Sequence, residues 1–277
     1  LIDTVVKIED QLSIVSGLGS NQFAGVFEMI EVNSEGVIPF EISFIDVQGN
    51  PFTISDSTTD GTQVIFDKTK PTLSPVSIIS DNSCSSGSIA KSGNMVSISY
   101  TASESILSSF ATVMGDTVSI SDLGSSQYKI DYQLNDSNIE GLVEFNIKVT
   151  DLAGNISEDV ISTSDGSGVN LDLTLPVLDY VHIESNNSYS SIAVLGDLVT
   201  LTFEPSEPLS STTITMANTA VTASENNGIY SATYIIQDSD MLTGGFLPFT
   251  INCNDCPGNV GIAVSYTHLT LPTILLV

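Results

Sequence analysis

Acidic residues in a recurring turn sequence are the groups of this chain whose types and spacing point to chemistry. The segment FIDVQGN recurs as VTDLAGN and again as CNDCPGN. The three copies align on Asp46, Asp151 and Asp255, each followed four residues later by Asn. A carboxylate in this setting can cap a turn by accepting backbone N–H bonds, or it can bind a hard cation. Both interpretations stay open at this point.

The acidic turn belongs to a longer internal repeat. Asp46, Asp151 and Asp255 are 105 and 104 residues apart. The segments GVIPFEI, GLVEFNI and GFLPFTI keep the same register, and GNMVSISYTASESI aligns with GDLVTLTFEPSEPL. Matching blocks in one register indicate tandem units of about 105 residues, a usual size for one domain. We expect 1–70 to be the C-terminal part of a repeat, 71–175 a complete repeat, and 176–263 a repeat that lacks most of its last strand.

The elements that must position these acids are predicted to be strands. Apolar and polar residues alternate along Met95 to Thr101 and along Val143 to Val149, with turn-forming clusters between such segments. No window shows a sustained helical stripe. A period of two with frequent turns over about 100 residues is typical of an immunoglobulin-type sandwich. The predicted fold is therefore all-β, with tandem immunoglobulin-like β-sandwich domains in an elongated array.

Three motifs in a fixed order carry a resemblance to a known family. D-x-T-x-P occurs at 67–71 and 172–176, an A-S-E-like turn follows near Glu104 and Glu207, and D-x-A-G-N comes near the end of a unit. This order resembles the bacterial-type immunoglobulin-like repeats of large extracellular adhesins. The resemblance implies an extracellular stalk, often stiffened by calcium. The chain departs from the pattern at Val47-Gln48 and at Cys256-Pro257, and it has no Trp.

Acids are predicted to gather where consecutive repeats meet. In an immunoglobulin topology the first-strand linker, the turn after the second strand and the last hairpin share one pole, and the loop before the penultimate strand of the preceding repeat faces them. The first set is Glu31, Glu35, Asp67, Glu104 and Asp151, and the second set is Asp136, Glu140, Asp172, Glu207 and Asp255. Close carboxylates repel, and a calcium ion, which takes 6–8 oxygen ligands, removes that repulsion. We predict calcium at both junctions, with these candidate ligands: Glu35, Asp67, Glu104, Asp151, Glu140, Asp172, Glu207 and Asp255.

The composition limits the classes of partner. The chain has 6 Lys and Arg against 33 Asp and Glu, a net charge of -27. Such a surface repels nucleic acid and anionic membranes. The chain is nevertheless 41% hydrophobic, so it is not an acidic disordered tail. No apolar run is long enough for a membrane span. The expected partners are neighbouring repeats of the same chain and a cell-surface protein or glycan.

Catalysis is not expected from these residues. His182 and His268 are the two histidines, and no serine or cysteine nucleophile has a partner nearby in sequence. Metalloprotease, P-loop and dinucleotide motifs do not occur. Cys253 and Cys256 form a C-x-x-C followed by a turn, which favours an incidental pair near a hairpin over a zinc or redox site, and Cys84 stands alone in a Ser-rich loop.

The two ends of the sequence suggest a piece of a longer protein. The chain begins at Leu1 with no signal-peptide pattern. VSYTHLTLPT, which starts at Val264, resembles the translation of a sequencing adapter. We therefore expect 264–277 to be a non-native tail, although its loose alternation also fits an ordinary strand.

The predicted function is structural: a stalk or spacer of a cell-surface or secreted adhesin, placed outside the cell and acting in cell adhesion. One alternative is an immunoglobulin-like module that itself binds a protein or glycan. A second alternative is an accessory domain of a large extracellular enzyme.

Overall fold

The computed structural model describes residues 1–240, 246–261 and 264–270. Strands make up almost all of its regular structure, and the helical element in these residues is the short 3₁₀ turn η1 (Cys84–Gly87). The chain divides into two compact units. Unit 1 comprises Leu1–Ser74, Ala102–Phe110 and Ile147–Val160, and unit 2 comprises Pro75–Thr101, Ala111–Asn146 and the residues from Ile161 onward.

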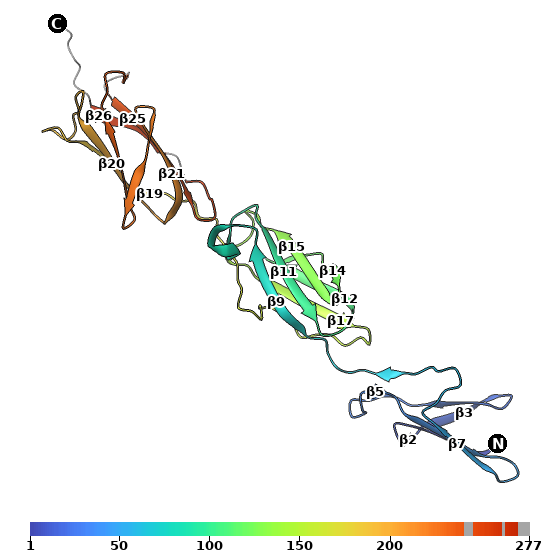
Figure 1. The fold of residues 1–277 in the computed structure, drawn as a ribbon. Coiled ribbons are helices and arrows are strands. Elements are labelled where there is room, and N and C mark those ends of the chain that lie inside the picture. The colour runs from blue at the N-terminus through green and yellow to red at the C-terminus, as the bar shows by residue number, and fades with distance from the viewer. Residues whose placement is uncertain (241–245, 262–263, 271–277) are drawn as a thin grey trace, which may run out of the picture. The chain divides into compact units, whose positions relative to one another are not determined.

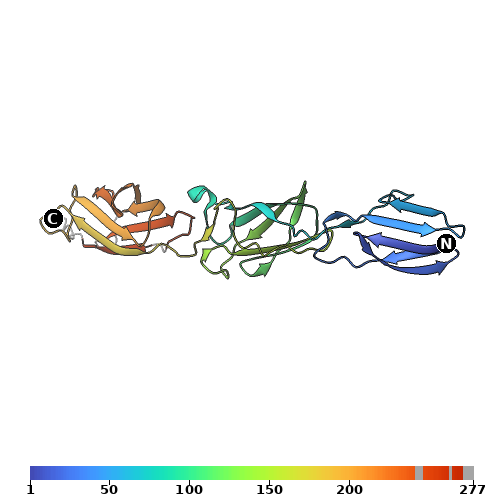
Figure 2. The ribbon, with the colours of Figure 1, turned by 90° about the horizontal axis from the view of Figure 1, so that it is seen from below.

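The first repeat, drawn in blue in Figures 1 and 2, forms three small antiparallel sheets within unit 1. The sheets are β2-β1-β6-β7, β3-β4 and β5-β8. Their bounds are β1 (Ile2–Ile8), β2 (Gln11–Leu12), β3 (Ile14–Gly19), β4 (Gln22–Val26), β5 (Gly36–Val37), β6 (Phe40–Ile45), β7 (Pro51–Ser55) and β8 (Ile65–Phe66). No apolar side chain between residues 3 and 70 is fully buried.

The middle repeat has ten strands: β9 (Leu73–Ser80), β10 (Ile89–Ala90), β11 (Met95–Ala102), β12 (Ile106–Val113), β13 (Asp116–Thr117), β14 (Ser121–Gly124), β15 (Gln127–Gln133), β16 (Gly141–Leu142), β17 (Phe145–Asp151) and β18 (Asn170–Leu171). Their sheet orders are β14-β15-β11-β9, β13-β12-β17 and β10-β18-β16. In β11 the side chains of Val96, Ile98 and Tyr100 are buried, as the alternation predicts. Phe145, Ile147 and Val149 form the buried face of β17 in the same way.

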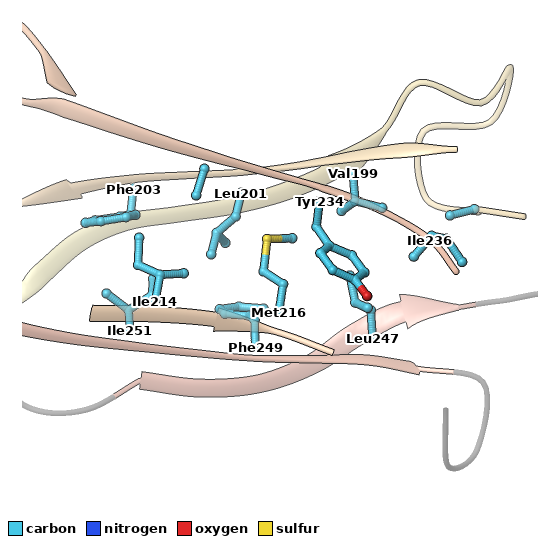
Figure 3. Packing of buried hydrophobic residues seen from close by; sticks show 12 residues of the cluster. Val199, Leu201, Phe203, Ile214, Met216, Tyr234, Ile236, Leu247, Phe249 and Ile251 are labelled. Carbon is cyan, nitrogen blue, oxygen red and sulfur yellow. The ribbon is translucent and has the colours of Figure 1, made fainter. Parts of the chain in front are cut away.

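The third repeat is a sandwich of two four-stranded sheets, β19-β20-β24-β23 and β22-β21-β25-β26. The bounds are β19 (Leu178–Ser185), β20 (Leu198–Pro205), β21 (Leu209–Met216), β22 (Thr219–Val221), β23 (Ala223–Asn226), β24 (Ile229–Ile235), β25 (Phe246–Asp255) and β26 (Val264–Thr270). Figure 3 shows Leu201 and Phe203 of one sheet facing Ile214, Met216 and Phe249 of the other. Interdigitated inner faces of this kind define a β-sandwich core.

The tail predicted to be non-native pairs as a strand. Residues Val264 to Thr270 form β26, antiparallel to β25, with Val264 opposite Ile251. An alternating segment of any origin can pair with an open edge, because the ladder bonds come from the backbone. The adapter origin of 264–277 and the repeat boundaries at 70, 175 and 263 therefore stay predictions.

The expectation that Cys84 stands alone is wrong, because Cys256 pairs with it and not with Cys253. Cys84 in η1 and Cys256 in the hairpin after β25 form a disulfide, with their Cα atoms 5.8 Å apart and a sequence separation of 172. Cys253 is the free, buried cysteine. Around the disulfide, Asn82 Nδ2 donates to the Pro257 carbonyl at 2.9 Å, and Lys91 Nζ donates to the Gly258 carbonyl at 2.8 Å.

This pairing gives a direct chemical prediction. Without reductant, the native chain should show no reactive thiol, and the unfolded chain should show one, from Cys253. Reduction should release the other two. Replacing Cys84 by Ser should lower the free energy of unfolding of unit 2 by about 2–4 kcal/mol, the usual contribution of a disulfide that closes a long loop. Thiol counting by mass spectrometry and chemical denaturation measure both effects. Ser86→Ala in the same turn is the matched control, and a C84S chain as stable as the parent would contradict the pairing.

Candidate metal centre: two acidic clusters

Three acids from separate parts of unit 1 lie together. Asp67 follows β8, Glu104 lies in the turn between β11 and β12, and Asp151 ends β17. One carboxylate oxygen of each lies within 4.8 Å of the others. Asp151 is fully buried, whereas Asp67 and Glu104 are half-buried. We call this group cluster A.

The same arrangement recurs in unit 2. Asp172 follows β18, Glu207 lies in the turn between β20 and β21, and Asp255 ends β25. Their carboxylate oxygens again lie within 4.8 Å of one another, and Asp255 is buried. We call this group cluster B. The residues of the two clusters occupy the same positions of the repeat, so the same local fold creates both.

The hairpin sequence D-x-x-G-N makes an extensively hydrogen-bonded turn. Asp151 Oδ1 accepts the backbone N–H groups of Ala153, Gly154 and Asn155 at 2.7–2.8 Å, and its Oδ2 accepts Asn155 Nδ2 at 2.8 Å. Burial raises the pKa of Asp151, but the bonds from Asn155, Gly154 and Ala153 outweigh burial, so the net pKa is below its ordinary value. The turn-capping interpretation is therefore confirmed, and the same carboxylate also faces the acids of cluster A.

Asn155 and Asn259 are part of the candidate site and were not among the predicted ligands. Asn155 Nδ2 also donates to the backbone carbonyl of Asp67 at 3.3 Å, and Asn259 Nδ2 donates to that of Asp172 at 3.1 Å. Each Asn thus ties the hairpin to the linker that supplies another acid. Their recurrence four residues after each Asp was the signal in the sequence that could have identified them.

Glu35 and Glu140 lie beside the clusters and bind the linker threonines. Thr69 Oγ1 donates to Glu35 Oε2 at 2.8 Å, and Thr174 Oγ1 donates to Glu140 Oε1 at 2.8 Å. Bonds from Thr69 and Lys68, and a hydrogen bond shared with Asp67, lower the pKa of Glu35. That shared bond is the main reason why the pKa of Asp67 is raised.

The weaker candidates Glu31 and Asp136 stay outside the two tight groups. Both side chains are exposed, and neither contributes an oxygen to cluster A or B. The backbone carbonyl of Glu31 accepts Lys68 Nζ at 2.6 Å, so this residue holds the linker through its main chain. Lys68 is thereby directed to a carbonyl and not to a cluster carboxylate.

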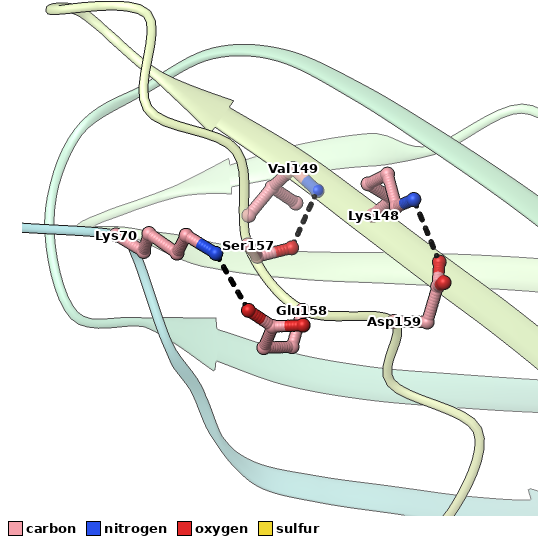
Figure 4. Close-up of polar contacts among 6 residues, drawn as sticks. All are labelled: Lys70, Lys148, Val149, Ser157, Glu158 and Asp159. Atoms are coloured by element: carbon pink, nitrogen blue, oxygen red, sulfur yellow. Dashed lines mark hydrogen bonds and ion pairs between the residues drawn. The ribbon is translucent and has the colours of Figure 1, made fainter.

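Negative charge accumulates in both clusters without a basic partner. Burial, followed by the nearby Asp151 and Asp67, raises the pKa of Glu104. Burial, followed by Asp255 and Asp172, raises the pKa of Glu207, whose Oε1 atom is buried with no protein hydrogen-bond partner. Within the described ranges, the ion pairs of the lysines involve other acids, such as Lys70–Glu158 and Lys148–Asp159 in Figure 4.

The donor set suits one class of ion. All six clustered side chains are carboxylates. Because they lie close together, their negative charges repel, and this repulsion disfavours the ionised form of each group. Calcium prefers carboxylate and carbonyl oxygens and tolerates irregular geometry, whereas zinc prefers His and Cys. The buried, unpaired Oε1 of Glu207 is the kind of atom that a cation would satisfy. The residues therefore fit a calcium ion at each cluster.

The structure also places the remaining chemical candidates. His182 lies on β19 opposite Thr202, about half exposed, with Glu184 Oε2 3.7 Å from its Nε2 atom. It is an outward-facing strand residue. The side chain of His268 lies outside the described residues. Among the described residues no helix has the length and apolar character needed to cross a bilayer.

Comparisons by sequence find no matching family model and no related curated protein. Comparison of folds finds a Ca²⁺-stabilised adhesin with which an Antarctic bacterium reaches out and binds ice, at 15% identity and a TM-score of 0.54, covering 97% of this chain. This chain spans 64% of that protein's solved length. A 1.5-MDa bacterial ice-binding adhesin is also similar, at 14% identity and a TM-score of 0.50, with 97% of this chain and 85% of that chain covered. The chain has an all-β, immunoglobulin-like sandwich fold.

Proposed function

We propose that the chain is a structural stalk or spacer of a cell-surface or secreted adhesin, and that calcium bound at clusters A and B stiffens it. The main support for this proposal is that the same three-carboxylate cluster recurs at both D-x-T-x-P linkers. At each linker an Asn side chain also donates a hydrogen bond to the backbone carbonyl of the linker Asp. A spacer needs linkers that resist bending. A cation shared by a linker acid, a turn acid and a hairpin acid would join three segments that otherwise repel one another.

Three further observations support the extracellular setting. The Cys84–Cys256 disulfide is of the kind that forms and persists in oxidising compartments. A net charge of -27 with 6 basic residues keeps a protein soluble and disfavours binding to nucleic acid. Two of the proteins with a similar fold are bacterial adhesins, and one of them is described as calcium-stabilised. The proposal assigns this chain no catalytic role.

Calcium titration calorimetry on the whole chain tests the proposal. We expect two sites, because there are two clusters. Glu104→Gln should remove the first site and Glu207→Gln the second, since each keeps the side-chain shape and removes one charge. Asp46→Asn is the matched control, because Asp46 makes the same turn but belongs to neither cluster. No binding at millimolar calcium, or unchanged binding in the double Gln variant, would reject the calcium sites.

The spacer role is tested separately by small-angle X-ray scattering. With calcium, the maximum dimension of the chain should be larger and more narrowly distributed than in chelator. If calcium binds but the scattering curve does not change, the ion stabilises the repeats without stiffening a stalk, and the spacer function is wrong.

A further inference from the structure

The hairpin that carries Asp255 is closed by fewer internal hydrogen bonds than the hairpin that carries Asp151. The backbone N–H of Ala153 donates to Asp151 Oδ1 at 2.8 Å. The equivalent residue of cluster B is Pro257, which has no N–H to donate. Among the described residues, the Oδ1 atom of Asp255 therefore accepts two backbone bonds, whereas that of Asp151 accepts three. The hairpin of cluster B is thus held less completely by its own residues.

The middle repeat holds this hairpin from outside. Cys256 directly follows Asp255 in sequence, and its side chain is joined to Cys84 of η1 by the disulfide. Asn82 and Lys91, also of the middle repeat, donate side-chain hydrogen bonds to two backbone carbonyls of the same hairpin. One covalent bond and two hydrogen bonds therefore connect the middle repeat to the hairpin that supplies an acid to cluster B.

Cluster A has the same acids without a covalent connection. The three cysteines of the chain lie at positions 84, 253 and 256, so unit 1 contains none. The hairpin of Asp151 is bonded to the linker through Asn155 and the carbonyl of Asp67, and cluster B has the equivalent bond. The disulfide is therefore a chemical difference between two otherwise matching clusters.

The disulfide opposes the charge repulsion within cluster B. Asp172 belongs to the linker between the middle and third repeats, whereas Glu207 and Asp255 belong to the third repeat. Because the three carboxylates repel one another, a linker that is free to bend would move Asp172 away from the other two. A covalent bond between the two repeats limits that movement, so the acids keep the spacing that a cation requires. A site that is preorganised in this way binds more tightly, because less conformational freedom is lost on binding.

On the basis of the proposed function, in which calcium binds at both clusters, we propose that the Cys84–Cys256 disulfide makes the calcium affinity of cluster B depend on the redox state, whereas cluster A is insensitive to it. A dithiol reductant supplies two electrons and two protons: the S–S bond breaks, Cys84 and Cys256 become thiols, and the reductant forms its own disulfide. The linker then bends more freely, and cluster B binds calcium more weakly. By thermodynamic linkage, bound calcium makes the disulfide harder to reduce by the same factor.

The test uses two full-length variants that each keep one cluster. E104Q retains cluster B, and E207Q retains cluster A. In calorimetric titrations with calcium, dithiothreitol should raise the dissociation constant of the E104Q chain about tenfold, within the usual range of coupling between two linked sites. The dissociation constant of the E207Q chain should not change. The matched control is E104Q with C84S and C256S, which should bind with the weaker affinity whether or not dithiothreitol is present.

The outcomes separate this coupling from calcium binding itself. Weaker binding on reduction in the E104Q chain alone supports the coupling. Equal affinities of the oxidised and reduced E104Q chains, with all three cysteines counted as thiols after reduction, would overturn it and leave the calcium sites in place. Equal weakening in both variants would also overturn it, because reduction would then act on the whole fold. Absence of calcium binding by either oxidised variant would reject the proposed calcium sites, and the coupling with them.

Discussion

Calcium at about 100 times its dissociation constant is expected to raise the melting temperature of the chain by about 10–20 °C. Binding to the native state alone contributes about 2.7 kcal/mol per site at this concentration. For a domain of about 100 residues, each kcal/mol moves the midpoint by about 4–8 °C. The physical source is the removal of repulsion among the carboxylates of clusters A and B. Scanning calorimetry in calcium and in chelator measures the shift.

The pH dependence of this shift provides its internal control. In chelator, the pKa values of Glu104, Asp172 and Glu207 are raised in the folded state, by burial first and by neighbouring acids second. The folded state then binds more protons than the unfolded state, so the free energy of unfolding rises as the pH falls. This rise begins at the raised pKa values of the folded state and is complete below the ordinary values, 4.5 for Glu and 3.8 for Asp. Calcium needs ionised carboxylates, so its contribution should fall over the same window. Parallel pH profiles with and without calcium would contradict calcium binding at the clusters.

Asp255→Ala is expected to lower the free energy of unfolding of the third repeat by about 3–5 kcal/mol in chelator, because several charge-assisted hydrogen bonds are lost together. Asp255 is buried, and its Oδ1 atom accepts the backbone N–H groups of Gly258 and Asn259 at 2.6–2.7 Å. Its Oδ2 atom accepts Asn259 Nδ2 at 2.8 Å. Removing the carboxylate leaves these donors unsatisfied in a buried turn. Urea denaturation followed by intrinsic tyrosine fluorescence measures the change.

Asp46→Ala is the matched control for this prediction. Asp46 accepts the same kind of bonds, from the backbone of Gln48 and Asn50 and from Asn50 Nδ2, all at 2.8 Å. Its turn is exposed, so water can satisfy the donors that the substitution leaves, and the loss should be smaller. Equal losses at the two positions would show that burial does not set the strength of this turn.

Much of the candidate site could be predicted from the sequence, because the clustered acids occupy equivalent positions in successive repeats. Asp67 and Asp172 occupy one position of the repeat, as do Glu104 with Glu207 and Asp151 with Asp255. An alternating strand pattern with fixed turn positions predicts which loops share a pole, and the structure brings these acids together. The positions of Glu35 and Glu140 were harder to predict, because both residues lie on long loops. Their side chains accept hydrogen bonds from the linker threonines.

The sequence by itself determined the β architecture, the repeat and the positions of the clustered acids, because these follow from local periodicity and from spacing along the chain. Only the tertiary structure decided the pairing of Cys84 with Cys256, since their sequence separation is 172 and no local pattern encodes that proximity. It also decided which apolar side chains are buried: Phe23 is 43% exposed, whereas Tyr128 at the same position of the next repeat is 8% exposed, because burial depends on the strands packed around a residue and not on its own strand alone. The double use of Asp151, which caps a turn and faces two other acids, likewise depends on loops that meet only in the folded chain.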